Sequence, residues 1–216
     1  MDFAAARRNM VDRQLRTNKV VDEAVLEALG QIPREAFLSD ALRSTAYVDE
    51  DLPLGNGRFL IEPMVFARLL QAAELKRTDL VLDLGCGPGY STAVLSRLVT
   101  MVVALECERP LAQRSAKALA NLQIDNAVVV EGPLERGWAA QAPYNAILLG
   151  GAAARIPEAV LGQLAEGGRL VGVEMRGGIG RAMLYLRHRG VISGRPLFDA
   201  AVPLLPGLAA EPSFVF

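Results

Sequence analysis

Apolar residues recur every three or four positions in the first part of the chain, which is the spacing of one face of a helix. Between residues 3 and 29 this pattern is interrupted once, so it predicts two short helices. Asn18 and Asp22 follow the interruption, and either side chain can cap the second helix. Gly30 and Pro33 then end it, because both residue types disfavour a helix interior.

Residues 50–63 contain four glycine or proline residues and predict a long irregular loop, which leads to a helix over residues 64–75. After residue 79 the pattern changes to short β-rich runs that alternate with helical ones. Strands are predicted at residues 80–84, 102–106, 127–130, 146–149 and 169–173. Helices are predicted at residues 90–98, 110–122 and 157–164, and a closing antiparallel strand pair at residues 182–187 and 198–205.

Strands that alternate with helices are typical of a parallel sheet with helices on both faces. The sequence therefore predicts an α/β fold with a doubly wound, mostly parallel seven-stranded sheet and an N-terminal helical cap. No internal repeat is visible, so we expect a single domain over residues 1–216. Within it, residues 1–78 form the cap and the loop, and residues 79–216 form the Rossmann-like core.

Composition excludes several classes of protein. Hydrophobic residues make up 51% of the 216 residues, which excludes intrinsic disorder. Lys plus Arg (23) nearly balance Asp plus Glu (24), so no nucleic-acid partner is expected. Two cysteines and one histidine are too few for a metal site, and neither a signal peptide nor a membrane span is expected.

These features predict a cytoplasmic protein with no membrane partner. Its oligomeric state stays open between a monomer and a homodimer. The apolar end formed by Phe214, Val215 and Phe216 is a candidate docking segment, either on the domain itself or on a second subunit.

A glycine loop joins the predicted strand at residues 80–84 to the helix that follows. Gly85, Gly87 and Gly89 let the backbone approach a ligand, and Cys86 is a small residue that we expect to pack beside it. The spacing G-x-G-x-G differs from the G-x-G-x-x-G turn that serves the pyrophosphate of a dinucleotide, which disfavours a nicotinamide-dependent oxidoreductase. A tight turn without a ligand is the structural alternative.

Two acidic residues near the loop indicate the ligand. Asp83, two residues ahead of the first glycine, disfavours phosphates and suits an ammonium group. Glu106 ends the next strand, where a carboxylate can bind both hydroxyls of a ribose. A nucleoside with an amino-acid tail meets both requirements, which predicts S-adenosylmethionine (SAM) as the cofactor. Cys107 is expected to pack beside this ligand and not to act as a reactive thiol.

Short motifs in a distinctive order run along nearly the whole chain. They are Met10-Val11-Asp12-Arg13-Gln14-Leu15, Ile32-Pro33-Arg34, Asp51-Leu52-Pro53-Leu54-Gly55, the glycine loop, Gly137-Trp138, Gly167-Gly168-Arg169-Leu170-Val171 and Val202-Pro203-Leu204. This order resembles the protein-L-isoaspartate O-methyltransferases, a family of class I SAM-dependent methyltransferases. The resemblance implies transfer of a methyl group to the carboxylate of isoaspartyl residues in damaged peptides or proteins.

The chain departs from the family pattern in the loop that contacts the acceptor. The family's loop reads G-Q-T-I-S-Q-P, and Ile61 stands in place of the serine that is taken to assist catalysis. Ile61 is not itself catalytic, because its side chain forms no hydrogen bond. Glu62 beside it repels an acidic acceptor unless Arg58 supplies a bidentate counter-charge, and for an amine or hydroxyl acceptor Glu62 is a candidate base.

Two further departures concern the cofactor pocket and its edge. Pro133 stands where the family carries the aspartate that holds the adenine amino group, so the backbone of Leu134 and apolar packing are expected to hold adenine instead. Asn145 begins a strand that the family tends to start with aspartate. At the other end of that strand, Gly150 and Gly151 leave room for a different acceptor.

Two alternatives to isoaspartate repair stay open. Ile61 and Glu62 are compatible with a SAM-dependent methyltransferase for another acceptor, a small molecule or a different protein side chain. Pro133 is compatible with a non-catalytic SAM-binding protein. Neutral drift within a working repair enzyme accounts for the same substitutions, because methyl transfer depends on positioning more than on acid-base groups.

Overall fold

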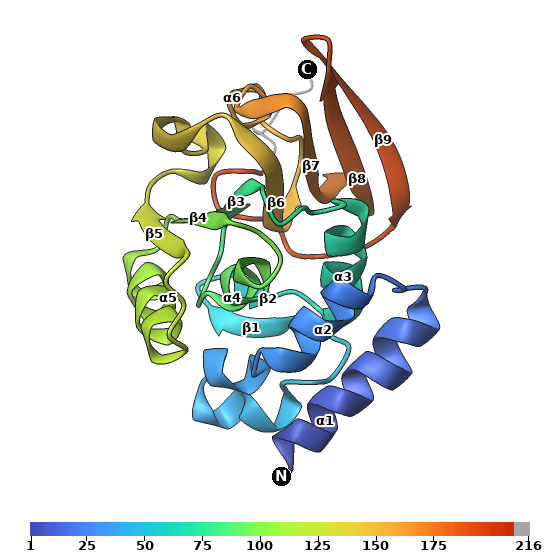
Figure 1. Ribbon diagram of the computed structural model, residues 1–216, viewed down its shortest axis with the longest axis vertical. Helices are drawn as coiled ribbons and strands as arrows, with labels where there is room; N and C mark the ends of the chain where they lie inside the picture. The colour runs from blue at the N-terminus through green and yellow to red at the C-terminus, as the bar shows by residue number, and fades with distance from the viewer. Residues whose placement is uncertain (210–216) are drawn as a thin grey trace, which may run out of the picture.

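The computed structural model describes residues 1–209, so the candidate docking segment Phe214–Phe216 lies outside the described residues. The N-terminal cap (blue in Figure 1) consists of four short helical segments. They are α1 (Phe3–Asn9), the π-helical η1 (Met10–Leu15), the 3-10 turn η2 (Arg16–Asn18) and α2 (Glu23–Gln31). Of the two cap candidates, Asn18 and Asp22, it is the Asp22 carboxylate that caps α2, by accepting hydrogen bonds from the backbone N–H groups of Ala24 (3.0 Å) and Val25 (3.2 Å).

The prediction of an irregular loop over residues 50–63 is wrong. After two more 3-10 segments, η3 (Arg34–Phe37) and η4 (Asp40–Thr45), the chain forms an antiparallel hairpin of β1 (Leu52–Gly55) and β2 (Arg58–Leu60). Asn56 and Gly57 make its turn with φ angles of 50° and 72°, and Asn-Gly is the strongest short-range signal for such a hairpin. The helix α3 (Pro63–Ala72) follows directly.

A doubly wound sheet forms the core of the fold, as the strand pattern predicts. Its seven strands have the order β5-β4-β3-β6-β7-β8-β9, and β3 to β7 pair in parallel. The parallel strands are β3 (Leu80–Leu84), β4 (Met101–Glu106), β5 (Ala127–Glu131), β6 (Tyr144–Ala153) and β7 (Leu164–Arg176). The chain turns from building one half of the sheet to the other between β3 and β6, so the switch point lies there.

The closing antiparallel pair is present, but its second strand was predicted too late in the chain. The pair consists of β8 (Ile179–His188) and β9 (Val191–Asp199), joined at Arg189 and Gly190 with positive φ angles of 52° and 76°. Residues 200–209 form no strand and turn back across the middle of the molecule, past β6 (Figure 1). Two backbone hydrogen bonds hold this segment beside β6: the Ala152 N–H donates to the Pro203 carbonyl, and the Leu205 N–H donates to the Ala152 carbonyl.

Side chains of the parallel strands alternate between two hydrophobic clusters, one on each face of the sheet. Val81 and Val102 face the cluster that joins α3, α4 (Tyr90–Ser96) and the N-terminal cap. Leu82 and Val103 face the opposite cluster, which includes residues of α6 (Glu158–Leu161). The helix α5 (Arg109–Asn121) packs beside β4 and β5.

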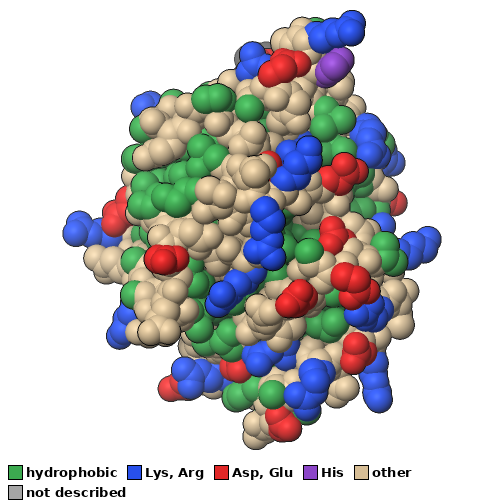
Figure 2. All heavy atoms as spheres, in the orientation of Figure 1, with side chains coloured by type: hydrophobic (Ala, Val, Ile, Leu, Met, Phe, Trp, Pro, Cys, Tyr) green, Lys and Arg blue, Asp and Glu red, His purple; other side chains and the backbone are tan. Residues whose placement is uncertain are grey.

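Acidic and basic side chains are interspersed on the face shown in Figure 2. Across the part of the chain that the structure describes, no helix has both the length and the apolar composition needed to cross a membrane.

Candidate active site

The glycine loop lies at the carboxyl end of β3, beside the switch point of the sheet. Gly85, Gly87 and Gly89 all have positive φ angles, of 80°, 56° and 98°. At Gly89 a side chain is excluded for a second reason, because a Cβ atom there would lie 2.5 Å from the Ser115 hydroxyl on α5. The loop therefore needs glycine both for its backbone path and for its contact with α5.

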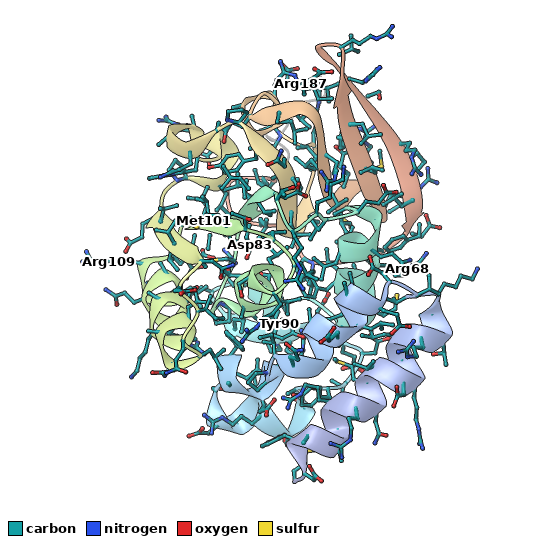
Figure 3. All side chains as sticks on the ribbon, in the orientation of Figure 1. Arg68, Asp83, Tyr90, Met101, Arg109 and Arg187 are labelled. Carbon is teal, nitrogen blue, oxygen red and sulfur yellow. The ribbon has the colours of Figure 1, made fainter. Side chains whose placement is uncertain are left out.

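Asp83, near the end of β3, lies in the middle of the molecule (Figure 3) and is fully buried. Its Oδ2 accepts hydrogen bonds from the hydroxyls of Ser91 (2.7 Å) and Thr92 (2.6 Å) on α4. Its Oδ1 has no hydrogen-bond partner within residues 1–209. Burial raises the pKa of Asp83 to about 6, against the two hydroxyl hydrogen bonds that lower it. One oxygen of the largely ionised Asp83 carboxylate can therefore still accept a hydrogen bond.

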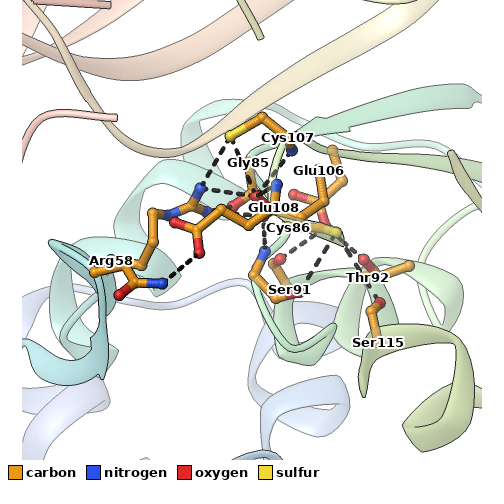
Figure 4. Close-up of polar contacts among 12 residues, drawn as sticks. Arg58, Gly85, Cys86, Ser91, Thr92, Glu106, Cys107, Glu108 and Ser115 are labelled. Atoms are coloured by element: carbon orange, nitrogen blue, oxygen red, sulfur yellow. Dashed lines mark hydrogen bonds and ion pairs between the residues drawn. The ribbon is translucent and has the colours of Figure 1, made fainter. Parts of the chain in front are cut away.

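Glu106, at the end of β4, is the most heavily bonded carboxylate of the site (Figure 4). Its two oxygens accept hydrogen bonds from the backbone N–H groups of Gly87 (2.8 Å), Cys107 (2.9 Å) and Glu108 (3.0 Å). They also form a bidentate ion pair with the Arg58 guanidinium, at 2.9 Å for both Nη atoms. The backbone donors hold Glu106 at the loop independently of Arg58.

Arg58 reaches this position from β2 and is only 1% exposed. Its Nη2 also donates to the Gly85 carbonyl at 3.0 Å, while its Nε has no partner among the residues that the structure describes. Arg58, which the sequence analysis expected to bind the carboxylate of the methyl acceptor, therefore pairs instead with Glu106, the residue expected to bind the cofactor. The β1–β2 hairpin, absent from the sequence prediction, is what brings Arg58 to Glu106.

The two cysteines lie beside this ion pair. Burial raises the pKa of Cys86 well above its usual value, and it raises that of Cys107 to about 11, with the neighbouring Glu106 charge adding to the effect. Both thiols are therefore protonated at neutral pH, and neither has the lowered pKa of a nucleophilic cysteine.

Ile61 and Glu62 follow β2 and stand before α3. Ile61 is buried, and its carbonyl accepts a hydrogen bond from Nη2 of Arg34 at 2.7 Å. Glu62 is half-buried, and its pKa is raised to about 7 by burial and by the charges of Asp49 and Asp51. A carboxylate with a pKa near 7 is suited to accept a proton at physiological pH.

Arg34 and Tyr90 are two polar residues of the site to which the sequence analysis assigned no role. Arg34 is fully buried, its guanidinium lies 5.0 Å from the centre of the Tyr90 ring, and its Nε donates to the Ala46 carbonyl at 2.8 Å. Arg34 Nη1 and the Tyr90 hydroxyl have no hydrogen-bond partner within the described range. Both line a small cavity with Ile61 and the glycine loop. The place of Arg34 within the Ile32-Pro33-Arg34 motif was the available signal.

Leu134 lies in the 3-10 turn η5 (Leu134–Arg136) after β5, and its side chain is fully buried. Gly132, two residues earlier, packs against the Trp138 ring, which a Cβ atom would meet at 3.2 Å. The indole Nε1 of Trp138 is buried without a partner in the described part of the chain. Where the family carries an aspartate, the region around Leu134 and Trp138 therefore offers apolar surface and an indole N–H group without a hydrogen-bond partner.

The polar groups at the glycine loop fit a nucleoside with an ammonium group. They provide a free buried oxygen on Asp83 and a carboxylate on Glu106. The space, in contrast, is filled: the cavity beside the loop has a volume of about 20 Å³, whereas pockets for small molecules measure roughly 300 Å³ or more. The side chains of Leu205 and Arg58 pack against Gly85, where a Cβ atom would lie 2.8 Å from Leu205 and 3.6 Å from Arg58.

Metal ligands do not gather at this site or elsewhere among residues 1–209, where no group of three or more His, Cys, Asp or Glu side chains could hold an ion.

Comparisons with known proteins agree on one family. The sequence profile described as protein-L-isoaspartate(D-aspartate) O-methyltransferase (PCMT) matches residues 6–190. A protein-L-isoaspartate O-methyltransferase of Roseiflexus castenholzii is 39% identical over 211 residues, which cover 97% of this chain and 96% of the relative. One from Rhodopseudomonas palustris is 41% identical over 169 residues, covering 78% of this chain and 69% of the relative.

Solved structures agree with the fold. A protein-L-isoaspartate O-methyltransferase matches with a TM-score of 0.83 and 25% identity, over 94% of this chain and 67% of its own. A Plasmodium falciparum protein described as a member of the same family, crystallised with S-adenosyl-L-homocysteine, matches with a TM-score of 0.79 and 20% identity, over 95% of this chain and 98% of its own.

Proposed function

Because the chain belongs to the protein-L-isoaspartate(D-aspartate) O-methyltransferase family, we propose that it transfers a methyl group from SAM to the carboxylate of isoaspartyl residues in peptides or proteins. The observation that supports the proposal is the combination of this family match with the geometry at the glycine loop, where the Gly87 backbone N–H donates a hydrogen bond to Glu106.

The donor supplies an activated methyl group on a sulfonium, and the residues of this chain hold and orient it. Glu106 would accept hydrogen bonds from the ribose hydroxyls, and Oδ1 of Asp83, which has no hydrogen-bond partner among the described residues, would accept one from the ammonium group. The glycine loop approaches the ligand with its backbone, and Cys86 and Cys107 pack beside it. Leu134 and Trp138 offer the adenine an apolar wall.

Arg58 changes partners in this proposal. If the ribose hydroxyls took the place of the guanidinium on Glu106, Arg58, which is 1% exposed, would be a buried cation without its counter-charge. A buried cation needs a counter-charge, and the carboxylate of the acceptor supplies it. Arg58 thereby compensates for the missing hydroxyl at Ile61 and offsets the charge of Glu62.

No general base is needed for this acceptor, because a carboxylate is already ionised at neutral pH. The task of the protein is to align the carboxylate with the methyl group and to exclude water. The β1–β2 hairpin is suited to that task, because Phe59 and Leu60 of β2 line the small cavity at the glycine loop.

The test is transfer of a labelled methyl group from SAM to an isoaspartyl peptide, with the corresponding aspartyl peptide as control. We expect base-labile label on the isoaspartyl peptide alone. If the chain binds SAM in the same sample and labels neither peptide, isoaspartate repair is excluded.

A second candidate keeps the donor and changes the acceptor to an amine or a hydroxyl. The observation that favours it is the raised pKa of Glu62, about 7, beside the buried Ile61. Such an acceptor must lose a proton, and Glu62 is placed to take it. Methyl transfer to a small amine, lost in a Glu62→Gln variant that still binds SAM, would establish this alternative. A cytoplasmic location and a monomeric or homodimeric state remain predictions.

A further inference from the structure

The two outermost strands of the sheet carry a strongly uneven charge. Residues 175–198, which include β8 and nearly all of β9, contain five arginines and neither Asp nor Glu. The whole chain has a net charge of -1, so the rest of the chain is acidic. Positive charge concentrated in one element favours a partner of the opposite sign.

Residues of β8 alternate between the two faces of the sheet. Ala182 and Leu184 are buried in the cluster that joins the sheet to α3 and the N-terminal cap. Arg181 and Met183 therefore lie on the opposite face, because neighbouring residues of a strand point to opposite sides.

Two hollows lie on this opposite face. The first has a volume of about 400 Å³ and is lined by Glu174, Arg176, Ile179, Arg181, Met183 and Pro196. The second has a volume of about 520 Å³ and is lined by Ala154, Arg155, Ile156, Leu161, Arg176 and Tyr185. Because Arg176 lines both, the two hollows form one groove, which we call the arginine groove. Each half combines apolar side chains with guanidinium groups.

The arginine groove lies at the same edge of the sheet as the glycine loop. Residues 154–156 directly follow β6, and Glu174 and Arg176 lie at the end of β7. The glycine loop follows β3, and β3, β6 and β7 are parallel neighbours, so their carboxyl ends lie along one edge. No residue of the glycine loop lines either hollow, so the groove is separate from the donor site.

Arg155 and Arg181, one in each hollow, are available to a partner. Their side chains are 77% and 58% exposed. Each lies near one exposed carboxylate, Glu158 at 3.5 Å and Asp199 at 3.4 Å. Exposed ion pairs of this kind contribute little free energy, so both guanidiniums can exchange these contacts for a new carboxylate at low cost.

Glu174 fixes Arg176 between the two hollows. Glu174 is 2% exposed, and its Oε1 accepts hydrogen bonds from the Tyr185 hydroxyl (2.6 Å) and the Ile156 N–H (3.1 Å). Its Oε2 accepts a hydrogen bond from Nη2 of Arg176 at 2.8 Å. The Arg176 side chain itself is 72% exposed, so its guanidinium is held on one side and open to solvent on the other.

We propose that the arginine groove binds a segment of a partner protein that carries both acidic and apolar side chains. Carboxylates of the partner pair with the three guanidiniums, and its apolar side chains enter the hollows against Met183 and Leu161. The two hollows have the size of pockets that bind ligands. A nucleic acid fits less well, because contacts to phosphates need no apolar surface.

The test measures binding of a short fluorescent peptide of alternating glutamate and leucine to the full chain, by fluorescence anisotropy at low salt. The double variant Arg155→Glu/Arg181→Glu reverses one charge in each hollow and should weaken binding by about tenfold or more. The matched control is Arg97→Glu/Arg109→Glu, which reverses two exposed arginines outside the groove. Arg109 lies on α5, far from β8 and β9 (Figure 3), and we expect the control to keep the wild-type affinity.

A second variant tests the apolar part of the groove. Met183→Ser keeps every arginine and should weaken binding by about fivefold, because the peptide leucines lose apolar contact. Added salt should weaken binding by the wild type and by Met183→Ser to the same degree, since both keep the charges. The melting temperature of each variant shows whether it is folded.

Four results would overturn the proposal. The first is equal affinity of the two double variants, and the second is equally tight binding of a single-stranded oligonucleotide, which would show a general preference for polyanions. The third is a dimer of the wild type that Arg155→Glu/Arg181→Glu dissociates, which would assign the groove to a second copy. The fourth is peptide binding only by a Phe214→Ser variant, which would assign the groove to the candidate docking segment of the chain itself. Methyl transfer to the isoaspartyl peptide is measured separately, so failure of this inference leaves the proposed function intact.

Discussion

Two buried arginine–carboxylate pairs lie at opposite ends of the parallel strands. Asp79 precedes β3 and pairs with Arg169 of β7 at 2.6 Å, at the amino end of the sheet. Glu106 ends β4 and pairs with Arg58 at 2.9 Å, at the carboxyl end. The chemistry of the two pairs is the same, so their surroundings must decide what each pair does.

The two arginines differ in how many of their nitrogen atoms donate a hydrogen bond. Arg169 donates from Nε, Nη1 and Nη2 to the carbonyls of Ala73 and Asn145 and to Asp79, tying the end of α3 to the sheet. Arg58 has a buried Nε without a partner in the described residues, and its carboxylate partner keeps three backbone donors of its own. The Arg169–Asp79 pair therefore holds α3 and the sheet together. Arg58 and Glu106 can separate at a lower cost in free energy, because Glu106 keeps its backbone hydrogen bonds.

The largest expected effect is on the free energy of unfolding, when the Arg169–Asp79 pair is broken. Arg169→Met leaves Asp79 buried with one remaining donor, the Lys76 N–H, and removing one partner of a buried pair costs about 3–5 kcal/mol. Urea unfolding followed by circular dichroism should show this loss. A decrease below about 1 kcal/mol would mean that the pair contributes no more than a surface pair does.

The next effect concerns donor affinity. Glu106→Gln removes the charge that is proposed to bind the ribose hydroxyls, and it should weaken binding of S-adenosylhomocysteine by about tenfold or more. Glu174→Gln is the matched control, because Glu174 is also a buried strand carboxylate (2% exposed) paired with an arginine, Arg176. Equal affinity for wild type and Glu106→Gln would remove Glu106 from the donor site.

Arg58→Met tests the exchange of partners directly. Because Glu106 keeps three backbone donors, the free energy of unfolding should fall by only about 1–3 kcal/mol, less than for Arg169→Met. The KM for an isoaspartyl peptide should rise about tenfold, while the affinity for S-adenosylhomocysteine should not decrease. A variant with weaker donor binding and an unchanged KM would contradict the role of Arg58 toward the acceptor.

The smallest effect is a pH dependence at Glu62. Its pKa is raised from 4.5 to about 7 in the folded chain, so the folded state binds the proton more tightly than the unfolded state. The associated stability is present below about pH 4.5 and is lost as pH rises through 7. Glu62→Gln should therefore melt about 2 °C above the wild type at pH 8, with a smaller difference at pH 4.5. A difference that does not grow with pH would contradict the raised pKa.

Patterns within short stretches of the chain predicted the elements that depend on local contacts. The strand at residues 80–84 and the helix cap at Asp22 agree with the structure, since both follow from periodicity and side-chain capping. The helix predicted at residues 157–164 is shorter in the structure, Glu158–Leu161, because Leu164 already begins β7. The errors at residues 50–63 and 198–205 arose because the two-residue turns with positive φ at residues 56–57 and 189–190 were not predicted. Asn56-Gly57 carried a recognisable signal, whereas Arg189-Gly190 carried a weaker one.

By itself, the sequence determined the doubly wound sheet, the glycine loop with its two acids, and membership of the methyltransferase family, because each depends on residue types at fixed spacings. Only the tertiary structure decided which side chains pack together against the glycine loop. Arg58 and Leu205 are separated by 147 residues (205 minus 58) and meet at Gly85. Such contacts depend on a hairpin and a returning segment packed on the finished sheet, and no local spacing encodes them.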